Sequence, residues 1–229
     1  MAWSETFLIV LGVALLVGLW AARFARRLDR LHRKVLASRM ALEAQLLRRA
    51  NIASRIATAA CFDPVTSVLV LAAADEAAAT RSNADRALLD AVPDLADALG
   101  VRVTRDASGP SNAAVVRGLE QMGIDQQRVD AENGLSLTLR EALDDGDEVA
   151  LLYSDTESAE LLEDLAAAWY RSQLARRFHN ESVSQVQLAR KNLGVRILHL
   201  AGHAVMPQPV DLDDTWPRNL KAPDGAVTT

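Results

Sequence analysis

Hydrophobic residues follow two different patterns along the first sixty positions. From Thr6 to Ala22, seventeen consecutive residues carry no charge; Arg23 then opens a run in which apolar residues recur every three or four positions. Continuous apolarity is typical of a helix surrounded by lipid, whereas the three-to-four spacing predicts an amphipathic helix that buries one face. The sequence therefore predicts one continuous helix from Thr6 to about Phe62, which leaves the bilayer and becomes the first arm of a helical domain.

The uncharged run is long enough to be a transmembrane segment. At 1.5 Å per residue it rises roughly 25 Å, slightly less than a typical hydrocarbon core of about 30 Å, and the long side chains of Arg23 and Arg26 can reach the interface. Trp3 and Trp20 stand near its two ends, where indoles favour the interface. A cleaved signal peptide fits less well, because no basic residue precedes the run and arginines occupy the cleavage zone.

Charge is unevenly distributed around this segment. Six of the twelve residues that follow it are basic, and they are the candidate lipid-contacting cluster: Arg23, Arg26, Arg27, Arg30, Arg33 and Lys34. The other flank has no Lys or Arg, so the positive-inside rule predicts a plasma-membrane protein whose large domain is cytoplasmic. The cluster has two interpretations, topology alone or contact with anionic lipid head groups.

Beyond the membrane exit, helical spacing continues. The first arm presents one stripe of apolar residues: Leu28, Leu31, Val35, Leu42, Leu46, Ala50, Ala53, Ile56 and Ala60. Arg39, Arg48, Arg49 and Arg55 are interpreted as lying off this stripe. Asp63 and Pro64 form a helix boundary, since Asp is a good N-cap and Pro is tolerated at the first helical position.

The middle of the chain predicts shorter elements. We expect a second helix to about residue 81, with the uncharged run 65–74 as its most buried part, and a short helical stretch that ends at Gly100. A loop is predicted over 101–114, and helix over 115–143 with an interruption near Gly123. Residues 148–153 (EVALLY) alternate like a strand, but a lone strand has no partner, so a helical interpretation is favoured.

The last long helix is predicted to begin at Asp155 or Thr156, with acidic residues in its first turn. Its inner stripe is Leu162, Leu165, Trp169, Ser172, Ala175, His179, Val183, Val186 and Leu193. From Pro207 the chain is rich in Pro, Asp and Gly, and this composition predicts loss of order. The cluster Asp211, Asp213 and Asp214 is interpreted as solvated loop charge.

Composition agrees with a helical protein. Half of the 229 residues are hydrophobic but only 4% are aromatic, and Gly and Pro are scarce for a turn-rich β protein. The predicted fold is all-α: an N-terminal transmembrane helix continuing into an antiparallel bundle of about four long helices. The predicted domains are 1–22 (a short extracytoplasmic N-terminus and the transmembrane helix), 23–206 (the cytoplasmic bundle) and 207–229 (a disordered tail).

Two segments resemble a known family. Gln45–Ala57 (QLLRRANIASRIA) is similar to the pattern Q-L-x-R-R-x-D-L-I-P-N-L-V of the LemA family of small bacterial membrane proteins, and Arg176–Val183 (RRFHNESV) resembles its closing R-x-Y-N-x-x-V. The end LAGHAVMPQPVDLDD resembles actinobacterial members. Ser54 replaces the family's Pro, which puts the kink expected there in doubt. The resemblance implies a membrane-anchored antiparallel bundle and no particular reaction.

No residue pattern predicts catalysis, a cofactor or a metal. His199 and His203 are four residues apart, but no Glu follows the first, so the zinc-protease pattern is absent. Cys61 has little nearby to activate it, and basic residues are not interleaved with aromatics as in nucleic-acid binders. We therefore expect a non-enzymatic scaffold at the membrane surface, with lipid and unidentified proteins as partners and self-association left open. The alternative is a membrane-tethered hydrolase or metal-dependent enzyme using His179, His199 and His203.

Overall fold

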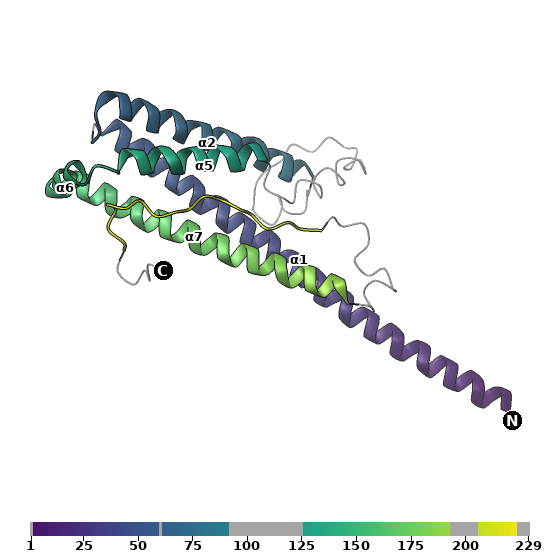
Figure 1. The fold of residues 1–229 in the computed structure, drawn as a ribbon. Helices are drawn as coiled ribbons and strands as arrows, with labels where there is room; N and C mark the ends of the chain where they lie inside the picture. The colour runs from purple at the N-terminus through teal and green to yellow at the C-terminus, as the bar shows by residue number, and fades with distance from the viewer. Residues whose placement is uncertain (1, 60, 92–125, 193–205, 224–229) are drawn as a thin grey trace.

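The computed structural model describes residues 2–59, 61–91, 126–192 and 206–223, with side chains for all of these except 2–6, 9, 29 and 81–91. The described residues form five helices and no strand (Figure 1). The helices are α1 (Ala2–Thr58), α2 (Pro64–Ala91), α5 (Gln126–Ala142), α6 (Gly146–Ser154) and α7 (Thr156–Lys191). The predicted all-α bundle is thereby confirmed for this part of the chain. The sequence-predicted loop over 101–114 and the interruption near Gly123 lie outside it.

Four long helices alternate in direction. α1 packs against both α7 and α2, α2 also packs against α5, and the short α6 packs against α7. Figure 1 shows the N-terminal part of α1 projecting well beyond the other helices. The bundle is therefore built around the second half of α1, while its first part stands alone.

The continuous first helix is confirmed, because α1 runs unbroken from Ala2 to Thr58. Its apolar stripe is buried as predicted from Leu28 to Ile56, except that Leu31 is only half-buried; Ala60 lies outside the described residues. The boundary after it also follows the prediction. The Asp63 carboxylate accepts hydrogen bonds from the backbone N–H groups of Val65 and Thr66, and Pro64 occupies the first turn of α2.

The second helix differs from the prediction in two ways. It continues to Ala91 instead of ending near residue 81. Its uncharged run is not the most buried part: Val70 and Ala74 are buried, but Val65 is 70% exposed and Val68 and Leu69 are also exposed. Ten consecutive uncharged residues, eight of them apolar, cover the whole circumference of a helix, and α1 and α5 contact only one side of it.

The two later helices begin with aspartate caps. Asp155 accepts a hydrogen bond from the N–H of Ser158, as predicted. Asp145, which was not predicted as a cap, accepts hydrogen bonds from the N–H groups of Asp147 and Glu148. The helical interpretation of residues 148–153 is confirmed by α6. On α7 the predicted stripe from Leu162 to Val186 faces inward, with Ala175 half-buried and the Trp169 side chain fully buried. Leu193, the last residue of that stripe, lies outside the described residues.

A buried ionic network crosses the centre of the bundle. Glu132 of α5 pairs with Arg49 of α1 at 2.7 Å and with Arg128 of its own helix at 2.7 Å. Arg128 also pairs with Glu43 of α1 at 3.2 Å and donates to the carbonyl of Ala77 in α2. Two cations and two anions are therefore matched inside the core, and the geometry fixes the relative positions of three helices.

The prediction that four arginines of α1 lie off the stripe is confirmed for Arg48 and Arg55, which are exposed, and wrong for Arg39 and Arg49. The latter two side chains are buried, and the Arg49 guanidinium stacks 4.8 Å from the centre of the Trp169 ring. At about 100° per residue, positions 39 and 49 fall within the arc that runs from Ile56 to Ala50 and holds Leu42. Their charge, and not their position on the helix, led to the wrong interpretation.

The C-terminal segment is the largest departure from expectation. Residues 206–223, here called the C-terminal strap, run along the bundle between α5 and α7, so the predicted tail 207–229 is wrong over this range (Figure 1). Val210 and Leu212 pack with Leu42 and Leu46 of α1, and Leu220 joins the main core. The average composition of the segment did not reveal these apolar residues, because polar residues separate them along the chain.

Polar side chains of the helices hold the strap in register. Asn180 of α7 donates to the Val210 carbonyl at 2.9 Å and accepts from the Val210 N–H at 2.8 Å. Arg176 makes two hydrogen bonds to Asp214, and Arg140 of α5 makes two to Asp213. The hydrogen bonds from Arg140 hold the pKa of Asp213 well below its usual range. Asp213 and Asp214 are thus anchors and not the solvated loop charges that were expected, whereas Asp211 is exposed as expected.

Candidate functional site

The six predicted basic residues lie together on one face of α1. Their positions at about 100° per residue fall within roughly 120° of arc, and all six side chains are exposed. This basic face borders the apolar stripe that packs on α7, and Arg27 is the member closest to that stripe. The structure therefore brings the cluster together as a continuous surface just after the uncharged run.

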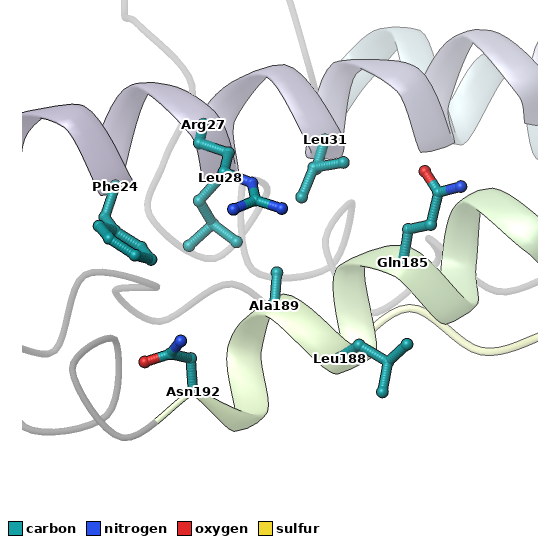
Figure 2. A pocket seen from close by; sticks show the side chains of 8 residues that line it. All are labelled: Phe24, Arg27, Leu28, Leu31, Gln185, Leu188, Ala189 and Asn192. Atoms are coloured by element: carbon teal, nitrogen blue, oxygen red, sulfur yellow. The ribbon is translucent and has the colours of Figure 1, made fainter.

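A groove of about 340 Å³ opens beside Arg27, where α1 and the end of α7 diverge. It is lined by Phe24, Arg27, Leu28, Leu31, Gln185, Leu188, Ala189 and Asn192. Figure 2 shows Phe24, Arg27 and Leu28 extending from α1 toward α7, with Ala189 and Asn192 facing them. The site combines an apolar floor with one guanidinium, and its volume lies in the usual range for small-molecule sites, about 300–1,000 Å³.

The α7 half of this groove was not anticipated from the sequence. Gln185, Ala189 and Asn192 are about 160 residues away from Arg27 in the chain, so local spacing could not join them. One indirect signal existed: Val183 and Val186 belong to the inner stripe of α7, which places the following turn next to α1. Next to the groove, Lys34 of α1 donates a hydrogen bond to the side chain of Gln185 of α7 at 3.0 Å.

His179, the one described histidine of the alternative enzymatic site, is only 1% exposed. Its Nδ1 lies 3.1 Å from Ser38 Oγ, and that hydroxyl also lies 2.8 Å from the Val35 carbonyl. A carbonyl can only accept, so the hydroxyl proton goes to Val35 and Nδ1–H donates to Ser38. Burial, together with the charge of Arg39, lowers the pKa of His179 to about 4. The neutral, buried imidazole confirms the predicted inward position and is out of reach of a substrate.

Of the other histidine and cysteine candidates, only Cys61 lies within the described residues. His199 and His203 lie outside the described residues, so the three histidines are not placed together here. Among the residues whose positions are described, no group of three His, Cys, Asp or Glu side chains could hold a metal ion. Cys61 is half-buried against the main core, with its sulfur 3.6 Å from Ser158 Oγ.

The projecting part of α1 carries apolar side chains on every side. Ten large hydrophobic residues there are between 40% and 68% exposed: Phe7, Leu8, Val10, Leu11, Val13, Leu15, Leu16, Val17, Leu19 and Trp20. Within the set of described side chains, which leaves out Thr6 and Ile9 of the uncharged run, no helix has both the length and the apolarity needed to cross a membrane.

Comparison with known proteins gives no relative for this chain. No family model, curated protein or solved structure matches it.

Proposed function

We propose that this chain is a single-pass membrane protein of LemA-like type, whose helical bundle acts as a non-catalytic interaction module at the membrane surface. Residues 6–22 form the anchor, and the bundle stands on the continuous α1. The observation that carries the proposal is the exposure of apolar side chains all round the projecting part of α1. A helix that is hydrophobic on every face is stable only when lipid or protein surrounds it.

Charge supports an orientation for this anchor. The basic face begins at Arg23, directly after the uncharged run, and no Lys or Arg precedes the run. By the positive-inside rule the bundle is cytoplasmic and the N-terminus lies outside. The basic face would lie at the level of anionic head groups, where each cation contributes roughly 1 kcal/mol of attraction.

The character of the bundle favours interaction over catalysis. Several polar groups in its core make helix-to-helix contacts, namely the network of Arg49, Arg128 and Glu132 and the contact of His179 with Ser38. Buried polar groups used in this way fix register, as single polar residues do in coiled coils. The enzymatic alternative gains no support from His179, which is shielded from solvent.

Two measurements test the proposal. The full chain, expressed in bacterial cells, should stay with membranes after alkaline extraction, and a reporter active only in the cytoplasm should be active when fused after Thr229. Replacing Arg23, Arg26, Arg27 and Arg30 with glutamate should weaken or invert the orientation. Replacing Arg48 and Arg55, which lie farther along α1, with glutamate should not. Release of the wild-type chain by alkali would refute the anchor, and an active extracytoplasmic reporter would refute the orientation.

A further inference from the structure

The groove between α1 and the end of α7 lies just beyond the end of the proposed membrane anchor. Arg27 follows Ala22 by five residues, which at 1.5 Å per residue places it about 7–8 Å beyond the uncharged run. The head-group layer on each side of a bilayer is of similar thickness, roughly 5–8 Å. Phe24 and Arg27 would therefore lie among lipid head groups, and so would Ala189 and Asn192, which line the same groove.

The lining of the groove has two chemical parts. Phe24, Leu28, Leu31 and Ala189 supply an apolar wall, and Phe24 is held in place by Trp20, with ring centres 4.4 Å apart. The guanidinium of Arg27 projects between the two helices and makes no hydrogen bond or ion pair with any side chain that the structure describes (Figure 2). An apolar wall beside an exposed guanidinium matches a ligand with a hydrocarbon chain next to an anionic group.

We propose that this groove binds one anionic phospholipid, with its phosphate on Arg27 and the upper part of one acyl chain against Phe24 and Leu28. The inference rests on the proposed membrane anchor and adds a defined lipid site to it. Charge complementarity favours this occupant. The rest of the basic face lies to one side of Arg27, and Arg190 and Lys191 offset the negative end of the α7 dipole. A neutral lipid would leave this positive field unmatched.

The test uses the full chain in nanodiscs that contain equal amounts of phosphatidylcholine and phosphatidylglycerol. Native mass spectrometry after release into mild detergent counts the lipids retained. The wild-type chain should retain one phosphatidylglycerol in preference to phosphatidylcholine. Arg27→Gln should reduce that retention about tenfold, the effect of losing one charge-assisted hydrogen bond. Arg30→Gln is the matched control: it removes the same charge from the same face without lining the groove, and retention should stay at the wild-type level.

A second variant tests the apolar part of the site. Ala189→Phe narrows the groove without changing charge and should also lower retention, with helicity checked by circular dichroism. Equal losses in Arg27→Gln and Arg30→Gln, or equal retention of the two lipids by the wild type, would overturn the site and leave the anchor intact. Failure of the wild-type chain to float with vesicles would refute the anchor itself, so the two failures are distinguishable.

Discussion

Replacing Asn180 with alanine should loosen the C-terminal strap and destabilise the whole bundle. The Asn180 amide satisfies both backbone groups of Val210, a residue that is itself buried. Removing the amide leaves a backbone N–H and a carbonyl without these partners. At about 1–2 kcal/mol for each partly buried group, the expected loss is about 2–4 kcal/mol.

Urea unfolding of the full chain in nanodiscs, followed by circular dichroism, measures this loss. With a slope near 2 kcal/mol/M, the midpoint should fall by roughly 1–2 M. Asn180→Asp keeps an acceptor for the Val210 N–H, but its second carboxylate oxygen replaces the amide donor and repels the Val210 carbonyl, so this variant should also be destabilised. Hydrogen exchange should locate the added opening of Asn180→Ala within residues 206–223. An Asn180→Ala variant as stable and as protected as the wild type would show that the strap does not dock on α7.

Three further predictions concern the core, each measured by urea unfolding. Because folding lowers the pKa of His179 to about 4, stability should rise with pH from about 4 to 6.5 by up to about 3 kcal/mol, and His179→Gln should lose this slope; an unchanged slope would contradict it. Trp169→Ala should destabilise by about 3–5 kcal/mol, and the half-buried Trp216→Ala by less; equal losses would show that Trp169 is misplaced. Glu132→Ala should cost about 3–5 kcal/mol, while Arg49→Met combined with Glu132→Leu should recover much of that; no recovery would argue against the ion pair.

Local periodicity accounts for the part of the fold that the sequence predicted well. The stripes of α1 and α7 repeat every three or four residues over many turns, so their inner faces, including His179 and Trp169, could be assigned without knowing their partners. The caps at Asp63 and Asp155 were also local, since each aspartate bonds to N–H groups two or three residues ahead.

Long-range pairing accounts for what was missed. Arg49 is stable in the core only because it pairs with Glu132, which comes 83 residues later in the chain. No residue near Arg49 in the sequence predicts that partner. The strap is the same case: Asp214 looks like a solvated acid until Arg176 of α7 is placed beside it. The groove at Arg27 is the same case, because its second wall comes from α7. The packing of α7 on α1 creates this wall, and no pattern in the sequence near Arg27 predicts it.

The place of the strap in the chain has a consequence for biosynthesis. Residues 206–223 leave the ribosome after the five described helices have emerged, yet Val210, Leu212 and Leu220 pack into the core that those helices form. If α1 is anchored as proposed, it would already be in contact with lipid before the strap is synthesised. A nascent chain interrupted before residue 206 would therefore leave the apolar residues beneath the strap uncovered, a feature that chaperones and proteases recognise.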